Sequence, residues 1–463
     1  MTSRKQIREY TKEHNWSANP DGTYDVDGNV RISRFLVRGG KLKIAFRKVT
    51  GNFEIDNVNL RSLSGTPRII LGSFSCTQNK LSDLQDGPEY VGKDYNCSQN
   101  SLNNLTGAPK IIHGSFKCYE CGLKTLTGGP EIVKGDYVVR QNNLKNLKGA
   151  PKEINGSFQC QYNQLVSLLG CPDKIGGSFY CNENYLQSLE LGPSEIAGTY
   201  NCGTNQLKDL SGSPKEIHGD FKCSINYLTS FKGAPAIIHG VLDISNNKLT
   251  SLLGCPKKIT TLICSHNKLQ SLKGCPKTLK GSLICAYNKL DSLTGCARKV
   301  GASFDCGVNR LTNLIDGPQF VGHDYICYAN PITSLVGVPN EIFGTFSCSE
   351  AELTSLYLGP QIVHGNYICD YQKPTLSDFT WIPKELGGVL RCINIVPTSV
   401  IPACRLPGIS SRDLPRIKCI DWAGFPRSLM DFKRWIPLNP EIKHINMTAA
   451  QSRYLRILLT LQV

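Results

Sequence analysis

The segment "NQLVSLLGCPDKIGGSFYC" (residues 163–181) carries the pattern that decides the fold, because the same pattern returns along most of the chain. A second clear copy is "NKLQSLKGCPKTLKGSLIC" (267–285). When the copies are aligned on the Phe/Tyr-x-Cys step, they follow one another every 21 residues, with one step of 20 residues. Self-similarity at a fixed period of this length predicts a repeat solenoid.

The cysteines of this step occupy one position of each repeat, which we call the cysteine ladder. Its members are Cys76, Cys97, Cys118, Cys160, Cys181, Cys202, Cys223, Cys264, Cys285, Cys306, Cys327, Cys348 and Cys369. Val139 and Ile244 fill two vacant places, and Cys392 follows after a longer step of 23 residues. Because Val and Ile can replace Cys, we expect the ladder to need a small apolar side chain rather than a thiolate.

An asparagine three residues after the ladder position forms a second column, the asparagine ladder. It comprises Asn79, Asn100, Asn142, Asn163, Asn184, Asn205, Asn226, Asn247, Asn267, Asn288, Asn309 and Asn330. We expect each side-chain amide to bond the backbone of its turn and to stack on the next copy, which would satisfy polar groups inside the coil.

The Gly-x-Pro step that follows the leucines is incompatible with a helix. Proline lacks a backbone donor, and it restricts the preceding residue to extended geometry. The Phe-x-Cys step has a period of 2, which places both side chains on one face of a short strand. The sequence therefore predicts a β-rich solenoid, a leucine-rich repeat horseshoe of about 17 repeats of period 21. Its convex side should be extended or turn-like.

The repeat resembles the short leucine-rich repeat of bacterial type III secreted effectors, with one extra residue between the Ile and the Phe. The 20-residue unit, which contains "PKKITTLICSHNKL" (256–269), lacks that residue and matches the effector spacing. The Gly-Ser-Phe-x-Cys form is even more similar to leucine-rich repeat proteins of tailed bacteriophages. There the segment from "DGTYDVDGNVRISRFLV" to "FRKVTGNFEI" (21–55) also has counterparts. The resemblance covers about residues 20–392 and implies the architecture more than the function.

Cys118 and Cys121 form a Cys-x-x-Cys pair, which could indicate a zinc or redox site. Cys118 is a ladder position, and Cys121 stands in the asparagine column, where leucine-rich repeats accept Cys. No second pair with ligand spacing accompanies them, so we predict a structural role and no bound metal or cofactor. The polar start "MTSRKQIREYTKEHNW" is not a signal peptide, so we expect free thiols in a reducing compartment.

The ends of the chain depart from the repeat. We predict an N-terminal cap over residues 1–52, with a helix within 3–14 followed by strands, and a solenoid over residues 53–392. Residues 393–463 are predicted to form a C-terminal cap or a docking module that ends in a helix over 448–461. The apolar run "YLRILLTLQV" is too short and too charged to cross a membrane, so we expect no membrane insertion.

Signals of catalysis are weak. His113, His218, His239 and His364 share the column before a glycine, and we expect His218 and His239 to lie about 5 Å apart on adjacent repeats. No carboxylate or cysteine stands in that column, so we predict no metal there. "KCIDW" (418–422) contains the Cys-x-Asp step of effector ubiquitin ligases in Cys419 and Asp421, but the remaining chain is too short for such a domain. We therefore predict that the protein is not an enzyme.

Basic residues concentrate between positions 246 and 310. Eleven lysines and arginines stand there against Asp291 and Asp305 alone. Four of them follow the ladder asparagine in consecutive repeats and should form one column at strand spacing: Lys248, Lys268, Lys289 and Arg310. Cations stacked in this way repel one another. The basic column is therefore either a solvated edge or a binding site for phosphate, an acidic protein or an anionic glycan.

Tyrosines recur at positions that we expect to be exposed on the strand face, among Ser, Asp, Asn and Gln. They are Tyr119, Tyr162, Tyr180, Tyr287, Tyr328 and Tyr371. Tyrosine is a good strand former, but Tyr among small polar residues is also typical of adaptable recognition surfaces. We favour recognition.

These features favour a non-catalytic recognition scaffold that binds a protein or an anionic glycan through its strand face and basic column. The resemblance to phage proteins implies a virion-associated protein whose partners would include other virion proteins. The alternative is an intracellular effector or anti-defence protein that binds a host protein. The expected location is accordingly the virion or the host cytoplasm. Nucleic acid is a weaker candidate because aromatic residues are sparse near the basic column apart from Tyr287.

Overall fold

The computed structural model describes residues 9, 11, 16–373, 376, 381, 383–392 and 417–422. The chain divides into two compact units, which we describe separately. Unit 1 contains residues 1–228 and 232–241, and unit 2 contains residues 229–231 and 242–463. The predicted helices within 3–14 and over 448–461 fall on residues that are wholly or mostly outside the described part.

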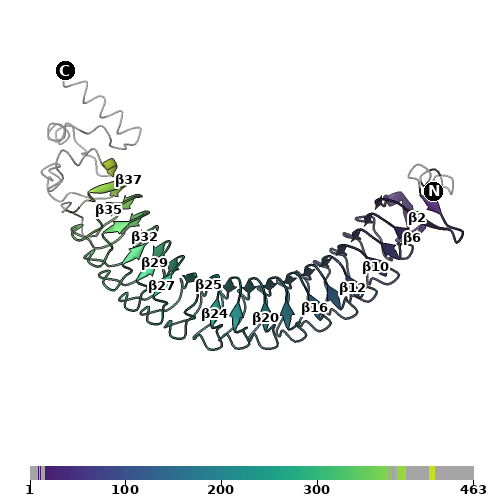
Figure 1. The fold of residues 1–463 in the computed structure, drawn as a ribbon, viewed down its shortest axis with the longest axis horizontal. Coiled ribbons are helices and arrows are strands. Elements are labelled where there is room, and N and C mark those ends of the chain that lie inside the picture. The colour runs from purple at the N-terminus through teal and green to yellow at the C-terminus, as the bar shows by residue number, and fades with distance from the viewer. Residues whose placement is uncertain are drawn as a thin grey trace, which may run out of the picture. The chain divides into compact units, whose positions relative to one another are not determined.

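Most repeats contribute two short parallel strands (Figure 1). A first-series strand follows the Gly-x-Pro step and ends at the buried Ile or Val of the repeat. A second-series strand contains the residue two positions before the ladder position, which is Phe or Tyr in most repeats and Leu in β25 (Val241–Asp243), β26 (Thr261–Ile263) and β28 (Leu283–Ile284). Two-residue strands suffice because strands of neighbouring repeats bond to one another in register, as β17 (Phe158–Gln159) does with β19 (Phe179–Tyr180).

The first-series strands of unit 1 are β8 (Ile69–Ile70), β10 (Tyr90–Val91), β12 (Ile111–Ile112), β14 (Ile132–Val133), β16 (Glu153–Ile154), β18 (Lys174–Ile175), β20 (Glu195–Ile196), β22 (Glu216–Ile217) and β24 (Ile237–Ile238). Its second-series strands are β7 (Phe53–Glu54), β9 (Phe74–Ser75), β11 (Tyr95–Asn96), β13 (Phe116–Lys117), β15 (Tyr137–Val138), β17, β19, β21 (Tyr200–Asn201) and β23 (Phe221–Lys222). Strand β25 (Val241–Asp243) spans the boundary of the units.

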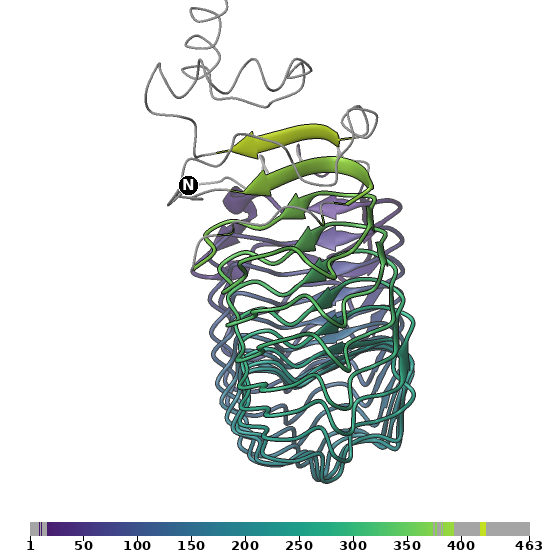
Figure 2. The same ribbon diagram turned by 90° about the vertical axis from the view of Figure 1, so that its left-hand side faces the viewer.

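The first-series strands of unit 2 are β27 (Thr278–Leu279), β29 (Lys299–Val300), β31 (Phe320–Val321), β33 (Glu341–Ile342) and β35 (Ile362–Val363). The second series comprises β26 (Thr261–Ile263), β28 (Leu283–Ile284), β30 (Phe304–Asp305), β32 (Tyr325–Ile326), β34 (Phe346–Ser347) and β36 (Tyr367–Ile368). The longer strand β37 (Glu385–Cys392) pairs with both β35 and β36, and β38 (Ile417–Trp422) lies beside it (Figure 2). The sheet therefore continues past residue 392.

The start of unit 1 contains short strands after residue 16, in the region where the sequence predicts strands. They are β1 (Ser17–Ala18), β2 (Thr23–Val26), β3 (Val30–Arg31), β4 (Val37–Arg38), β5 (Lys41–Leu42) and β6 (Ala45–Val49), with the 3₁₀ helix η1 (Arg34–Leu36) between them. β1 and β2 are antiparallel, and β2 and β6 are parallel.

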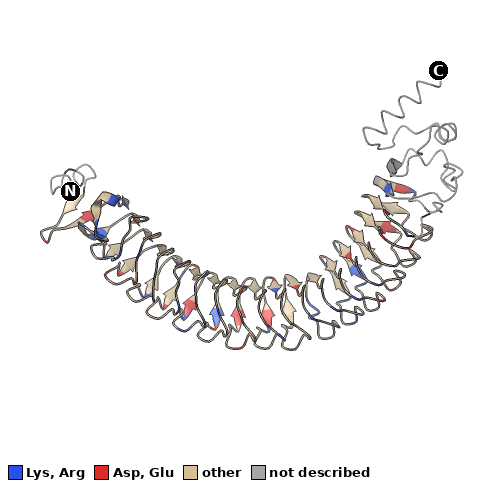
Figure 3. Ribbon diagram, turned by 180° about the vertical axis from the view of Figure 1, so that it is seen from behind, with Lys and Arg blue, Asp and Glu red and all other residues tan. Residues whose placement is uncertain are grey.

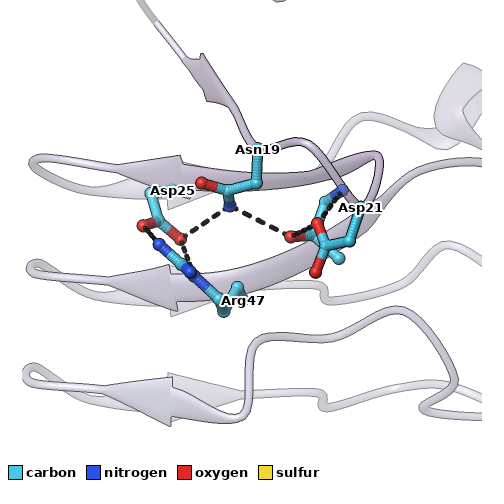
Figure 4. Close-up of polar contacts among 5 residues, drawn as sticks. Asn19, Asp21, Asp25 and Arg47 are labelled. Carbon is cyan, nitrogen blue, oxygen red and sulfur yellow. Dashed lines mark hydrogen bonds and ion pairs between the residues drawn. The ribbon is translucent and has the colours of Figure 1, made fainter.

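Polar contacts join these first strands (Figure 4). Arg47 on β6 forms an ion pair with Asp25 on β2, and Asn19 Nδ2 donates to Asp25 Oδ1 over 3.1 Å. The bonds from Arg47 lower the pKa of the Asp25 carboxyl. A buried Trp16 packs edge-on against Phe46, with ring centroids 5.0 Å apart.

The core of each unit is a stack of identical side-chain layers. In unit 1 an aromatic column runs from Phe53 to Phe221, and its neighbouring rings lie 4.9–6.2 Å apart. The ladder cysteines and the two leucines of each repeat are buried beside the aromatic residue. Burial of Leu and Phe side chains at about 1.5–3 kcal/mol each is the main stabilising contribution.

The aromatic residue and the residue before proline change together from repeat to repeat. Five repeats combine Gly before Pro with Tyr: Gly87 with Tyr95, Gly129 with Tyr137, Gly192 with Tyr200, Gly317 with Tyr325, and Gly359 with Tyr367. Repeats with Thr, Ala, Cys, Ser or Val before Pro carry Phe or Leu instead. A methyl group built on Gly317 would stand 3.2 Å from Tyr325 Oη, so the phenol oxygen reaches the space that a side chain occupies elsewhere.

The asparagine ladder is confirmed. Asn163 Nδ2 donates to the carbonyl of Val139 in the preceding repeat at 3.0 Å and to that of Cys160 in its own at 3.1 Å. Its Oδ1 accepts the Leu144 N–H at 3.1 Å. Each amide thus satisfies buried backbone groups of two successive repeats. Gln372 takes this role in the repeat where the sequence pattern decays. Its Oε1 accepts the Leu353 N–H, and its Nε2 donates to the carbonyls of Cys348 and Cys369.

A column of left-handed residues lies between the two ladders, two positions after the ladder cysteine. It comprises Gln78, Gln99, Glu120, Gln141, Tyr162, Glu183, Thr204, Ile225, Asn246, His266, Tyr287, Val308, Ala329, Glu350 and Tyr371, with φ between 50° and 57°. Left-handed φ is uncommon for residues other than glycine and an outlier for β-branched ones such as Ile225. We call this set the left-handed column.

The predicted fold is confirmed: parallel strands are stacked in about 17 turns of period 21, and the only regular helix among the fully described elements is η1. No helix within the described residues is long and apolar enough to cross a membrane.

Candidate functional site

The basic column lies on the surface of unit 2 as the sequence predicts. Lys248, Lys268, Lys289 and Arg310 are all exposed. The backbone sets their spacing, because Lys289 N donates to Leu269 O at 2.9 Å and Arg310 N to Leu290 O at 3.0 Å. Lys268, Lys289 and Arg310 form no salt bridge with any described residue.

Some charges elsewhere in the described part of the protein are arranged in pairs. On the first-series strands of unit 1, Lys134 contacts Glu153 at 2.5 Å and Lys174 contacts Glu195 at 2.9 Å. Acidic and basic residues are visible on neighbouring strands there (Figure 3). Lys268, Lys289 and Arg310 differ from these pairs, because no salt bridge with a described residue offsets their mutual repulsion.

An aromatic row lies beside the basic column in the same repeats. His266 and Tyr287 of the left-handed column stack with ring centroids 4.2 Å apart and an interplanar angle of 13°. Tyr328 Oη donates to Tyr287 Oη at 3.3 Å, which raises the pKa of Tyr328 to about 12. We call His266, Tyr287 and Tyr328 the aromatic row.

A glycine makes this arrangement sterically possible. A methyl group on Gly307 would lie only 2.5 Å from Cε1 of Tyr328, so the ring occupies space that any other residue would fill. Gly307 N also donates to Asp305 Oδ1 at 2.9 Å. Burial nevertheless raises the pKa of the Asp305 carboxyl. The site thus combines stacked rings, one carboxyl group and adjacent free cations.

A shallow hollow lies further along the strand face of unit 2, where the asparagine ladder is interrupted. Ala351 takes the asparagine position and lines the hollow together with Ala329, Pro331, Tyr371 and Lys373. The predicted residue Tyr371 is therefore at a concave place, with 45% of its surface exposed.

The structure does not bring the predicted tyrosines of unit 1 into a single site. Tyr119 is half-buried beneath the Arg140 guanidinium, whose central carbon is 4.5 Å from the ring centre. Tyr162 is 52% exposed in the left-handed column, and Tyr180 lies on β19. No contact among these three is found in the described part of the chain.

Sequence reasoning missed several exposed residues of the strand face. Tyr185 and Tyr227 stand one residue after the ladder asparagine, which is the position of the basic column, and are 52% and 47% exposed. Their shared position was the signal that could have identified them. His266 and Gly307 gave no signal, because their roles depend on ring orientation.

The ladder thiols are buried in the core. Burial raises the pKa of Cys76, Cys160 and Cys202. Burial likewise raises the pKa of Cys118. The Sγ atoms of Cys118 and Cys121 lie 3.5 Å apart, and this contact lowers the pKa of Cys121. No third metal donor joins this pair in the described residues, and the cysteines from Cys76 to Cys369 are free.

A carboxylate that the sequence reasoning overlooked lies beside the histidine column. His218 and His239 stack with centroids 5.4 Å apart, which confirms their predicted proximity. Glu216 approaches them from two positions earlier in the chain, and its Oε1 is 2.6 Å from His239 Nε2. The search along one column missed it because strand neighbours on one face are two residues apart.

The proposed ligase residues Cys419 and Asp421 lie on strand β38, where the backbone of Asp421 pairs with Arg391. Most of residues 393–463 fall outside the described part, so their role as a cap or docking module stays a prediction.

No protein-family model and no curated protein matches this sequence. Among solved structures, YopM from Yersinia enterocolitica WA-314 is similar, with 19% identity, a TM-score of 0.59 and coverage of 86% of this chain and 85% of that chain. A leucine-rich effector protein, YopM from Yersinia pestis, aligns at 20% identity over 65% of this chain and 84% of its own, with a TM-score of 0.45. The parallel ladders and the likeness to the first structure together show that this chain has the leucine-rich repeat fold.

Proposed function

We propose that the protein is a non-catalytic recognition scaffold whose strand face in unit 2 binds a negatively charged partner, either an acidic protein surface or an anionic glycan. The observation that carries this proposal is the run of exposed cations without salt bridges beside the aromatic row. Aromatic faces supply contact area at low entropic cost, and cations supply attraction and orientation.

A charge-reversal experiment tests the site. Lys268, Lys289 and Arg310 would be changed together to Glu, and binding to partners captured from the native source and to a sulfated glycan would be measured. The matched control reverses Lys273, Lys277 and Lys280, which are exposed in the repeat between Lys268 and Lys289 but outside the second-series strand and the basic column. We expect loss of binding in the first variant alone, with wild-type binding weakening as salt is raised. Equal effects of the two variants would refute the site.

The biological setting divides the proposal into two forms. The sequence resemblance to phage proteins supports a virion-associated protein, and the resemblance of the repeat to that of type III secreted effectors supports a molecule that acts on host proteins inside the cell. Mass spectrometry of purified particles separates them, because only the first form requires the protein in the particle.

A further inference from the structure

Glu216, His218 and His239 meet on one surface of unit 1, away from the ladders. Glu216 begins β22 and His218 follows its last residue, so the two side chains flank the buried Ile217 and share the outer face of the strand. β22 and β24 pair in register, with Ile217 opposite Ile238, which places His218 opposite His239 on the next repeat. The three exposed side chains thus belong to two hydrogen-bonded strands.

Their donor atoms are close enough to share one ion. Each residue offers one ligand atom, and these atoms all lie within 4.8 Å of one another. The imidazoles are nearly parallel, at 15°, and Glu216 Oε1 is 2.6 Å from His239 Nε2. The strand pairing fixes the backbones of all three residues, so little reorganisation is needed to turn the ligand atoms toward a common centre.

We propose that Glu216, His218 and His239 bind a divalent transition metal, with zinc or nickel as the fitting class. Two imidazoles and one carboxylate form a recognised zinc ligand set that leaves a fourth position for water. Imidazole ligands also suit nickel, and the set excludes the thiol ligands that would select softer ions. In the metal-bound form the ion replaces the proton shared by Glu216 and His239.

The chain contains a natural counterpart that lacks one ligand. In unit 2, His364 Nε2 is 2.8 Å from Glu341 Oε1, and the ring of Phe343 stacks on His364 with centroids 5.3 Å apart at 16°. The register is the same, because Ile342 pairs with Val363 as Ile217 does with Ile238. Phe343 therefore stands where His218 stands, and the Glu341 cluster offers two ligands instead of three.

The experiment compares the full, reduced chain with two variants by calorimetric titration with Zn²⁺ and Ni²⁺. His218→Phe copies the counterpart and should lower the affinity of this site at least about tenfold, since loss of a ligand exceeds the 10–100-fold cost of altering its supporting contacts. Phe343→His should add one further equivalent of bound metal. Both exchanges place residues already found at this position of the fold, so circular dichroism should be unchanged.

Any metal binding by the thiols is the same in all three proteins, because the variants keep every cysteine. Bound metal should also raise the melting temperature of the wild type, and less so that of His218→Phe, because an ion bound only by the folded chain stabilises it. Identical titrations of the wild type and His218→Phe, or no added equivalent in Phe343→His, would show that the cluster is a surface hydrogen bond only.

Discussion

At the scale of single residues, the asparagine column shows that one side chain can link the backbones of two successive repeats. An ordinary ladder amide joins two repeats through bonds from its Nδ2 and to its Oδ1, as Asn163 does. Cys121 replaces that amide with a thiol, whose Sγ reaches the Cys97 carbonyl at 3.4 Å. Sulfur is at most a weak acceptor, so the Leu102 N–H lacks the amide oxygen that Leu81 and Leu123 have.

Changing Cys121 to Asn should therefore stabilise the protein. We expect a gain of about 1–2 kcal/mol in the free energy of unfolding, because a buried backbone donor acquires a full acceptor. Denaturant unfolding of the reduced protein measures it. Cys121→Ala is the matched control and should bring no gain, and a destabilised Asn variant would contradict the shared role of the column.

At the scale of the repeat, the element is defined by complementary shapes as much as by hydrophobicity. The Tyr325 hydroxyl is buried and has no hydrogen-bond partner among the described residues, and burial raises its pKa. Its oxygen instead fills space beside Gly317. Tight interiors respond to a single methyl group, so the two positions should be energetically coupled.

A double-mutant cycle on Gly317→Ala and Tyr325→Phe tests this coupling. Gly317→Ala alone should destabilise, since its methyl group would lie 2.9 Å from Leu314 O and 3.2 Å from Tyr325 Oη. Tyr325→Phe relieves the second of these contacts, so the double variant should recover about 1 kcal/mol relative to additivity. Thermal unfolding of the four proteins gives the coupling, and strict additivity would mean that the pairing in the sequence has no steric origin.

The elements differ in how far the sequence predicts them. The period of 21 residues predicts both ladders and excludes convex helices, because Pro and the spacing of Leu and Asn act locally. Gln372 escaped prediction because a longer side chain reaches the same atoms from an irregular repeat. The basic column was predictable from spacing alone. The aromatic row was predicted only in Tyr287 and Tyr328, since the stacking of His266 and the space above Gly307 depend on side-chain orientation.

At the scale of the whole molecule, repeats contact mainly their neighbours, so stability is approximately a sum over repeats and interfaces. Properties shared by every repeat are therefore multiplied. The ladder thiols are the clearest case. Burial raises the pKa of ladder thiols in both units, as it does for Cys160 in unit 1 and Cys306 in unit 2.

The protein should consequently lose stability steeply at alkaline pH. A folded-state pKa above the unfolded value of 9.0 means that the unfolded chain releases protons first, so stability is complete below pH 9 and falls above it. Each such thiol contributes about 1.4 kcal/mol of loss per pH unit. Denaturant unfolding of reduced protein between pH 7 and pH 10 should show this fall, and a flat profile would be inconsistent with buried neutral thiols.

The left-handed column has an evolutionary consequence. Its members include acidic, amide, aromatic and aliphatic residues, yet all keep φ between 50° and 57°. The backbone at these places is dictated by the flanking ladders, so point mutations there can alter what the surface recognises while the scaffold persists. Such a lineage can change the chemistry of this exposed surface through small genetic steps, since the cost of roughly 1–2 kcal/mol per left-handed residue is similar for all of these side chains.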